Sequence, residues 1–247
     1  MLSTKLKFGG RLIEPDVRRL HDLRDVAFDT AWFEAAPDRD AYYMYRDLAR
    51  TFSDADIITR HKLRYDITII PPFNMGLESI KTYGHYHPRV NPELSYTYPE
   101  LYEVLEGEAH YLLQRTQNEG SVDNVILVKA TRGDKVIVPP NHGHVTINPS
   151  DRVLKMANWV CRSFASLYEP YKALRGGAYY ELINGRLLPN RAYQHVPEIK
   201  VVYPVEVPDQ GLIKRKPAYE LVEEPHLLEF LTAPEEHMAL FHELYSR

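Results

Sequence analysis

The chain has 247 residues, with 30 basic and 34 acidic side chains and a formal net charge of −4. Its pI of about 6.3 argues against nucleic acid as a partner, because nucleic-acid binders usually carry a basic face. The sequence has no apolar run near the roughly 18 residues that span a membrane, and no apolar signal-peptide core at its start. We therefore expect a cytoplasmic protein with no membrane partner, in which the single cysteine, Cys161, is a buried thiol.

The middle of the chain predicts a series of short strands. Before it, residues 34–51 predict a short helix and an extended piece. Eight later segments are rich in β-branched and aromatic residues and are separated by Gly, Pro, Asn and Asp: 63–70, 79–87, 100–107, 108–114, 123–129, 134–138, 144–147 and 153–160. Many short strands at even spacing predict an antiparallel sandwich or barrel.

The end of the chain predicts loops, one strand and a helix. Residues 166–199 are rich in Gly, Pro and Asn, and residues 200–207 alternate as a strand does. Thr232 and Glu235 have the spacing of a capping box, which predicts that a helix starts there. An apolar stripe on that helix, formed by Met238, Phe241 and Tyr245, is expected to pack against the barrel or a partner subunit.

Two histidines, His85 and His87, stand two residues apart in a predicted strand. Residues i and i+2 of a strand point to the same face, so both imidazoles can reach one ion. The pair alone is weak evidence. Glu100 opens the next strand, where a hairpin would carry its carboxylate back toward the pair, and a Pro-Pro turn delivers His144 onto a further strand. One carboxylate and three imidazoles suit Fe, Mn, Ni or Zn better than Ca or Mg.

These residues form two linked motifs that resemble the paired motifs of the cupin superfamily. The first runs through Gly76, His85, His87, Glu100 and Gly107, and the second through Gly133, Pro139, His144 and Asn148. Within the cupins, the chain resembles the cupin-type phosphoglucose isomerases from about residue 8 to about residue 165. The segments that carry this resemblance are 10–20, 82–87, 100–108, 111–114 and 138–148.

The resemblance implies an all-β fold, the cupin double-stranded β-helix or jelly-roll barrel, with an N-terminal extension and a C-terminal helical extension. We expect one structural domain. In it residues 1–62 pack on the barrel, residues 63–165 form the barrel with the metal site, and residues 166–247 add a loop, a strand and a helix.

The resemblance also implies roles for individual residues. His85, His87, Glu100 and His144 would bind a divalent metal ion, and Glu100 and Tyr102 would be catalytic. Contacts to a phosphosugar would fall on Thr68, Thr82, Gly84, Tyr102 and Tyr168. Thr82 and His85 are an odd number of residues apart, so a bulge at Gly84 is needed to turn both toward one site.

The chain departs from the family at several positions. Asn141, Val160 and Ser166 replace a tyrosine, a tyrosine and a histidine, and the loop at residues 88–99 is longer than in most cupins. Substitutes for the lost sugar contacts could come from Tyr96, Tyr98 or His142, and of these His142 is our candidate for substrate binding. Arg64, Lys81 and Arg89 are candidate helpers for a phosphate, whereas His110 is expected to be structural.

The implied activity is interconversion of glucose 6-phosphate and fructose 6-phosphate, a step of glycolysis and gluconeogenesis, by a homodimer. The alternatives are another metal-dependent cupin enzyme and a non-catalytic cupin that binds phosphosugars. The sequence leaves open the identity of the metal, and it leaves open whether the reaction follows an enediol route or a hydride shift.

Overall fold

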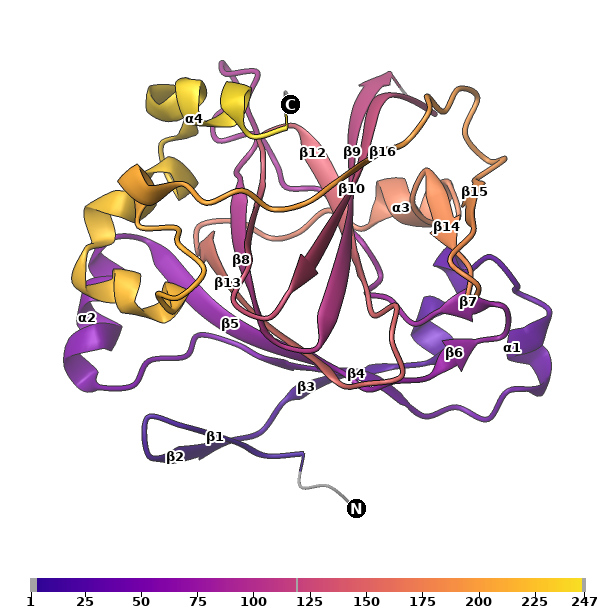
Figure 1. Ribbon diagram of the computed structural model, residues 1–247, viewed down its shortest axis with the longest axis horizontal. Coiled ribbons are helices and arrows are strands. Elements are labelled where there is room, and N and C mark those ends of the chain that lie inside the picture. The colour runs from indigo at the N-terminus through magenta and orange to yellow at the C-terminus, as the bar shows by residue number, and fades with distance from the viewer. Residues whose placement is uncertain (1–3, 119, 246–247) are drawn as a thin grey trace.

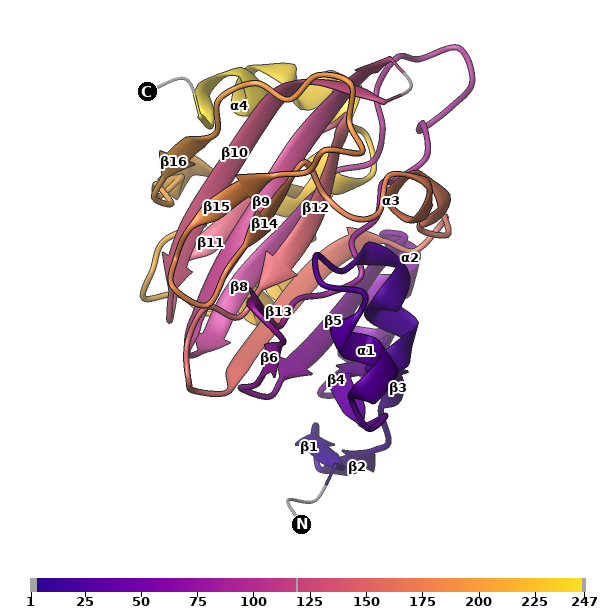
Figure 2. The same cartoon turned by 90° about the vertical axis from the view of Figure 1, so that its right-hand side faces the viewer.

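The computed structural model describes residues 4–118 and 120–245, and strands dominate it (Figure 1). Its two largest sheets have six and four strands and face each other (Figure 2). One cluster of buried side chains joins them: Val104 and Met156 come from the first sheet, Leu113 and Val128 from the second. This confirms the predicted cupin jelly-roll barrel with extensions at both ends. Among the described residues, no helix is long and apolar enough to cross a membrane.

The six-stranded sheet is antiparallel and combines barrel strands with strands from the N-terminal segment. Its order is β11 (Lys135–Val138), β8 (Glu100–Glu106), β13 (Leu154–Cys161), β5 (Leu63–Ile70), β4 (Asp40–Tyr45) and β3 (Asp16–Arg19). The four-stranded sheet has the order β12 (His142–Ile147), β9 (Glu108–Asn118), β10 (Ser121–Thr131) and β16 (Lys200–Val202), with β16 parallel to β10.

Smaller elements surround the two sheets. Three two-stranded ribbons pair β1 (Leu6–Phe8) with β2 (Arg11–Ile13), β6 (Asn74–Met75) with β7 (Glu78–Ser79), and β14 (Tyr179–Glu181) with β15 (Leu187–Pro189). The α-helices are α1 (Trp32–Ala35), α2 (Phe52–Arg60), α3 (Glu169–Ala173) and α4 (Met238–Glu243). The 3₁₀ helices are η1 (His21–Val26), η2 (Pro208–Gln210), η3 (Ala218–Glu223), η4 (Pro225–Leu231) and η5 (Pro234–His237).

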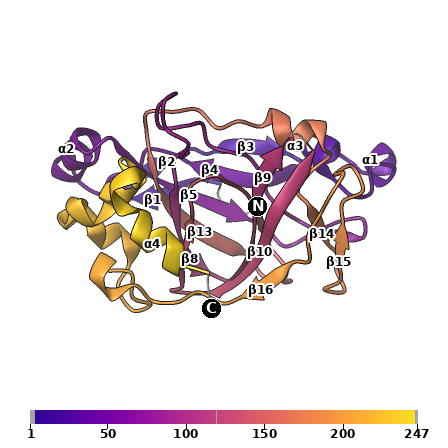
Figure 3. The same cartoon turned by 90° about the horizontal axis from the view of Figure 1, so that it is seen from above.

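The six-stranded sheet is covered on both faces, and this decides which side chains reach the interior. Its outer face carries Tyr65, Leu101 and Trp159, which pack in one buried cluster with Leu228 and Phe230 of the C-terminal extension (Figure 3). Side chains alternate along a strand. The neighbouring positions, which include several polar residues, therefore turn inward to the barrel.

Most predicted strands are confirmed, two predicted strands need correction, and one helix was missed. The segment 79–87 is not a regular strand: after β7 it makes only isolated bridges, because Gly84 adopts a φ of +84°. The strand predicted at residues 200–207 ends at Val202, two residues before Pro204, which lacks the N–H that a ladder requires. Helix α2 was not predicted, although Thr51 caps it by accepting a hydrogen bond from Asp54 N at 3.0 Å.

The predicted capping box near the C-terminus is also wrong. The Thr232 hydroxyl donates to the Glu229 carbonyl oxygen at 3.2 Å, so it belongs to the end of η4, and a 3₁₀ turn precedes α4. Two of the three residues of the apolar stripe nevertheless pack on the barrel: Phe241 and Tyr245 join the outer cluster, and the Tyr245 hydroxyl donates to the Ile137 carbonyl at 2.7 Å. Cys161 is a buried free thiol, as expected.

Candidate metal centre

A bulge turns the first histidine pair into the barrel. Lys81 pairs with Ile147 and His85 pairs with His144 in antiparallel bridges. The first segment therefore advances four residues while β12 advances three. Two residues, Tyr83 and Gly84, therefore lie opposite the single Val145. This is the geometry of the bulge predicted at Gly84, and it lets Thr82 and His85 serve the same site.

Glycine is required at the bulge for two reasons. The φ of Gly84 is +84°, a conformation that side chains other than glycine rarely adopt. A Cβ at this position would also lie 2.6 Å from Val145 Cγ2 and 2.7 Å from the ring of Tyr171, both of which are buried.

Two further elements deliver the other candidate ligands. Glu100 is the first residue of β8, and His144 lies on β12 after the Pro-Pro turn that follows β11. Asn141 closes that turn with a φ of +66°, which asparagine tolerates better than most residues. His144 then exchanges two backbone hydrogen bonds with His85, at 3.2 and 3.0 Å, which brings the two motifs together.

The structure gathers His85, His87, Glu100 and His144 so that one ligand atom from each lies within 4.8 Å of the others. The Nε2 atoms of His85 and His87 are 3.2 Å apart. Glu100 Oε2 lies 3.2 Å from Nε2 of His87 and 3.2 Å from Nε2 of His144. It is buried and has no hydrogen-bond partner among the described residues. Four potential ligand atoms thus converge on one point.

The protonation states of this cluster suit a cation. Burial lowers the pKa of His85 well below its usual range, and burial also lowers the pKa of His144, so both imidazoles are neutral. Burial alone would raise the pKa of Glu100, but contacts with His144 and His87 hold it well below its usual range, so the carboxylate is ionised. Neutral imidazoles and an ionised carboxylate are the forms that bind a divalent metal.

The spacing of the donor atoms also fits a metal. Ligand atoms held about 2.0–2.2 Å from one ion lie about 3 Å apart when they are neighbours in its coordination shell. The contacts of 3.2 Å among the cluster agree with this. The ring of His87 is held on its far side, because its Nδ1 donates to the Tyr98 carbonyl oxygen at 2.8 Å and its Nε2 therefore points into the cluster.

A cavity of about 390 Å³ opens beside the cluster, within the roughly 300–1,000 Å³ of small-molecule sites. The predicted substrate residues Thr68, Thr82, Gly84, Tyr102 and Tyr168 all line it. The Tyr102 hydroxyl lies 3.1 Å from His144 Nε2. Burial, followed by the Glu100 charge, raises the pKa of Tyr102 well above its usual range, so its hydroxyl stays protonated.

His142 lies apart from this cavity. It is not among the lining residues, its side chain is buried, and its Nδ1 donates to the Pro140 carbonyl oxygen at 2.9 Å. The structure therefore does not bring it to the other predicted substrate residues. Tyr98, another suggested substitute, also stands behind the cavity wall, where its ring stacks on Phe164 at 4.8 Å.

Sequence reasoning missed several residues that line the cavity: Tyr42, Arg46, Asp66, Asn158 and Phe164. The signal for two of them was strand alternation. Asp66 is two residues before the predicted contact Thr68 on β5, and Asn158 lies on the neighbouring strand β13, directly across from Asp66. Val160 and Ser166 line the cavity too, at positions where the family resemblance leads us to expect a tyrosine and a histidine.

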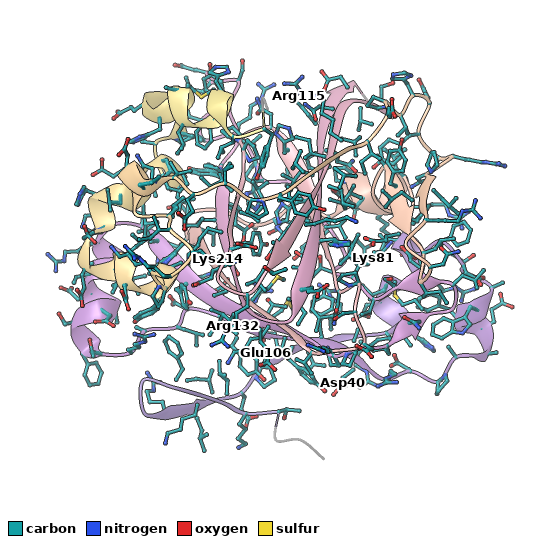
Figure 4. The ribbon with its side chains drawn as sticks, viewed as in Figure 1. Asp40, Lys81, Glu106, Arg115, Arg132 and Lys214 are labelled. Carbon is teal, nitrogen blue, oxygen red and sulfur yellow. The ribbon has the colours of Figure 1, made fainter. Side chains whose placement is uncertain are left out.

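The candidate phosphate helpers have different environments. Arg64 lines the cavity, but it makes an ion pair with Asp66 at 2.8 Å. Lys81, labelled in Figure 4, is buried in an ion pair with Glu78 and does not line the cavity. Arg89 is also absent from the lining.

Arg18, which sequence reasoning did not single out, lies beside the aromatic wall of the cavity. Its guanidinium carbon is 5.6 Å from the ring centroid of Tyr83 and 5.8 Å from that of Tyr168. Its Nε is buried and has no hydrogen-bond partner within the described part of the chain.

His110 has a structural environment, as expected. Its Nδ1 lies 2.8 Å from the carboxylate oxygens of Glu181, and it does not line the cavity beside the candidate metal cluster. The contact joins the barrel to β14.

Comparisons with known proteins agree with this geometry. The family model described as glucose-6-phosphate isomerase matches residues 17–198, well over half of the chain. The glucose-6-phosphate isomerase of Thermococcus litoralis is 29% identical over 156 residues, which cover 61% of this chain and 73% of that protein. The glucose-6-phosphate isomerase of Pyrococcus horikoshii is 26% identical over 153 residues, covering 61% of this chain and 73% of its own length.

Two solved structures show more distant likeness. An oxalate oxidase structure has a TM-score of 0.40 and 13% identity, covering 54% of this chain and 58% of that chain. A Bacillus subtilis oxalate decarboxylase structure has a TM-score of 0.36 and 17% identity, covering 55% of this chain and 30% of that chain. From the family match over residues 17–198, the paired motifs and the jelly-roll barrel, we conclude that this chain belongs to the cupin-type glucose-6-phosphate isomerase family.

Proposed function

We propose that this protein is a metal-dependent aldose–ketose isomerase that interconverts glucose 6-phosphate and fructose 6-phosphate. The observation that carries the proposal is the position of the four-residue cluster. Three of its members, His85, His87 and Glu100, line a cavity whose other walls hold hydroxyl and backbone groups suited to a phosphosugar. In cells, this reaction would serve glycolysis and gluconeogenesis.

The cavity can hold the substrate by its two ends. We assign the 6-phosphate to Thr68, Thr82, the backbone at Gly84, and Tyr168, because hydroxyl and N–H donors at these positions suit phosphate oxygens. Arg18 adds positive charge behind this end, at the tyrosine wall. The C1 and C2 atoms of the open-chain sugar then lie at the end formed by the metal cluster.

The proposed ion is Fe, Mn, Ni or Zn, held by His85, His87, Glu100 and His144. When bound, it supplies Lewis-acid polarisation of the substrate carbonyl. The chain's own groups hold and move the protons. Of the two carboxylates that line the cavity, Asp66 is committed to its ion pair with Arg64, whereas Glu100 Oε2 has no hydrogen-bond partner in the described structure.

We therefore assign to Glu100 the transfer of a proton between C1 and C2. The neutral hydroxyl of Tyr102 donates a hydrogen bond to a sugar oxygen. Solvent deuterium would enter the product carbon if Glu100 moves the proton, whereas a hydride shift would leave the product free of deuterium.

A coupled assay on fructose 6-phosphate tests the proposal. Formation of glucose 6-phosphate is followed with the metal-loaded protein, after treatment with a chelator, and after the metal is restored. We expect turnover that the chelator removes and the metal returns. Absence of chelator-sensitive turnover would overturn the isomerase assignment and favour a binding cupin or a different metal-dependent cupin enzyme.

We also infer that the protein is a homodimer. Strands β3 and β16 end their sheets, and Val201, Tyr203 and Val205 are exposed on and next to β16. An exposed edge strand can pair with strands of other chains and cause aggregation, and a partner subunit that covers the edge prevents this. Light scattering after gel filtration measures the mass, and a value at the 28.7 kDa of one chain would contradict the dimer.

A further inference from the structure

The loop at residues 88–99 is part of the support of the metal cluster. It leaves the site after His87 and returns at Glu100, so both of its ends are candidate ligands. It is folded on itself: Val90 N donates to the Tyr96 carbonyl at 2.9 Å, and Tyr98 N donates to the Pro88 carbonyl at 3.2 Å. A defined loop, rather than an open connection, thus separates two ligands.

The loop is fastened to the turn that leads to the fourth ligand. Thr97 N donates to Asn141 Oδ1 at 3.1 Å, and Asn141 N donates to Thr97 Oγ1 at 2.7 Å. Asn141 stands where the family resemblance leads us to expect a tyrosine, and its φ of +66° presents its backbone N–H and its side chain to the same partner. Two reciprocal hydrogen bonds therefore join the long loop to the β11–β12 turn.

The residue after this anchor acts directly on a ligand. The carbonyl oxygen of Tyr98 accepts from Nδ1 of His87 at 2.8 Å. A carbonyl can only accept, so the contact places a proton on Nδ1 and turns Nε2 toward Glu100, whose Oε2 lies 3.2 Å away.

An aromatic group keeps the same ring in place. Phe164 lies 4.5 Å from the His87 ring and stacks on Tyr98 at 4.8 Å with an interplanar angle of 17°. The orientation of His87 thus depends on the position of Tyr98, which the Thr97–Asn141 pair holds.

We propose that Asn141 and Thr97 are positioning residues that set the affinity of the cluster for its metal ion, by holding the Tyr98 carbonyl against His87. The inference rests on the proposed metal-dependent function. Groups that orient a ligating histidine typically change metal affinity by about 10–100-fold when they are removed. Because this pair acts through Tyr98, we expect the lower end of that range.

The test measures the binding of Mn²⁺ to metal-free protein by isothermal titration calorimetry. Thr97→Val removes the hydroxyl with little change of shape, and Asn141→Gly removes the amide while tolerating the positive φ. We expect each to raise the Kd for Mn²⁺ about tenfold. Thr97→Ser keeps the accepting oxygen, and Ser95→Ala changes an exposed residue of the same loop, so both should bind like the wild type.

Further readouts separate positioning from general damage. Thermal unfolding of the metal-free proteins should be similar, and isomerase turnover should recover at saturating Mn²⁺. Unchanged Mn²⁺ affinity in both Thr97→Val and Asn141→Gly would overturn the inference, as would loss of cooperative unfolding in both. If the wild type itself binds no Mn²⁺ and no other divalent ion, the proposed metal dependence fails first.

Discussion

Replacement of Gly84 by alanine tests whether the bulge before the histidine pair is as tightly constrained as its geometry indicates. Gly84 combines two constraints that are normally found apart: a φ of +84° and a lack of room for a Cβ, which would lie 2.6 Å from Val145 Cγ2. Gly185, in the turn between β14 and β15, provides a matched control. Its φ is +77°, and no atom lies within 4 Å of the place a Cβ would take.

The expected cost follows from these two contributions. A left-handed conformation destabilises a residue other than glycine by about 1–2 kcal/mol. Overpacking a well-packed site costs about 1–3 kcal/mol more. We therefore expect Gly84→Ala to lower the free energy of unfolding by about 2–5 kcal/mol and Gly185→Ala by about 1–2 kcal/mol. Replacing glycine by alanine also lowers the conformational entropy of the unfolded chain, which stabilises both variants by the same amount. This contribution therefore cancels when the two variants are compared.

Urea denaturation of both variants and the wild type measures these free energies. The Gly84→Ala protein should also lose isomerase activity, since relief of the clash shifts Thr82 and His85. Equal losses of stability for the two variants would show that the space around Gly84 is not limiting. The packing argument would then be wrong, even if the backbone argument survived.

Three further predictions concern the site. Glu100→Gln should lower turnover by about 10²–10⁴-fold while circular dichroism shows the fold intact, and near-normal turnover would remove Glu100 from the mechanism. Arg18→Gln should raise the KM for fructose 6-phosphate about tenfold, or about 1.4 kcal/mol, with little change of kcat. Arg24→Gln, an exposed control, should leave KM unchanged. Burial lowers the pKa of His142 from 6.5 to about 4. Between pH 6.5 and pH 4, His142 binds a proton in the unfolded chain but not in the folded protein, so the free energy of unfolding falls as the pH drops through this window, by at most about 3.4 kcal/mol. In His142→Gln, with chelator present, the free energy of unfolding should fall less than in the wild type as the pH is lowered through this window. A pH profile identical to that of the wild type would refute the assignment of this acid sensitivity to His142.

Strand alternation and motif spacing were enough to predict most of the barrel and the four candidate ligands. The period of two placed His85 and His87 on one face, and the odd separation from Thr82, whose substrate role the family resemblance implies, predicted a bulge at Gly84. These features are local, because they depend on backbone geometry and on the conformational freedom of single residues. Local signals failed where the tertiary context competed with them. Thr232 has the spacing of a helix cap, but it serves the end of the preceding 3₁₀ turn instead.

By itself, the sequence determined the class of fold, the residue types of the candidate metal site and most of the strands of the barrel. Only the tertiary structure decided what surrounds the site. It placed Asp66 and Asn158 in the cavity and kept His142 out of it. It also brought the Tyr98 carbonyl to His87 through a loop anchored on Asn141. Such contacts join residues far apart in the chain, and their geometry depends on how loops pack against one another, for which the periodicity of single strands carries no information.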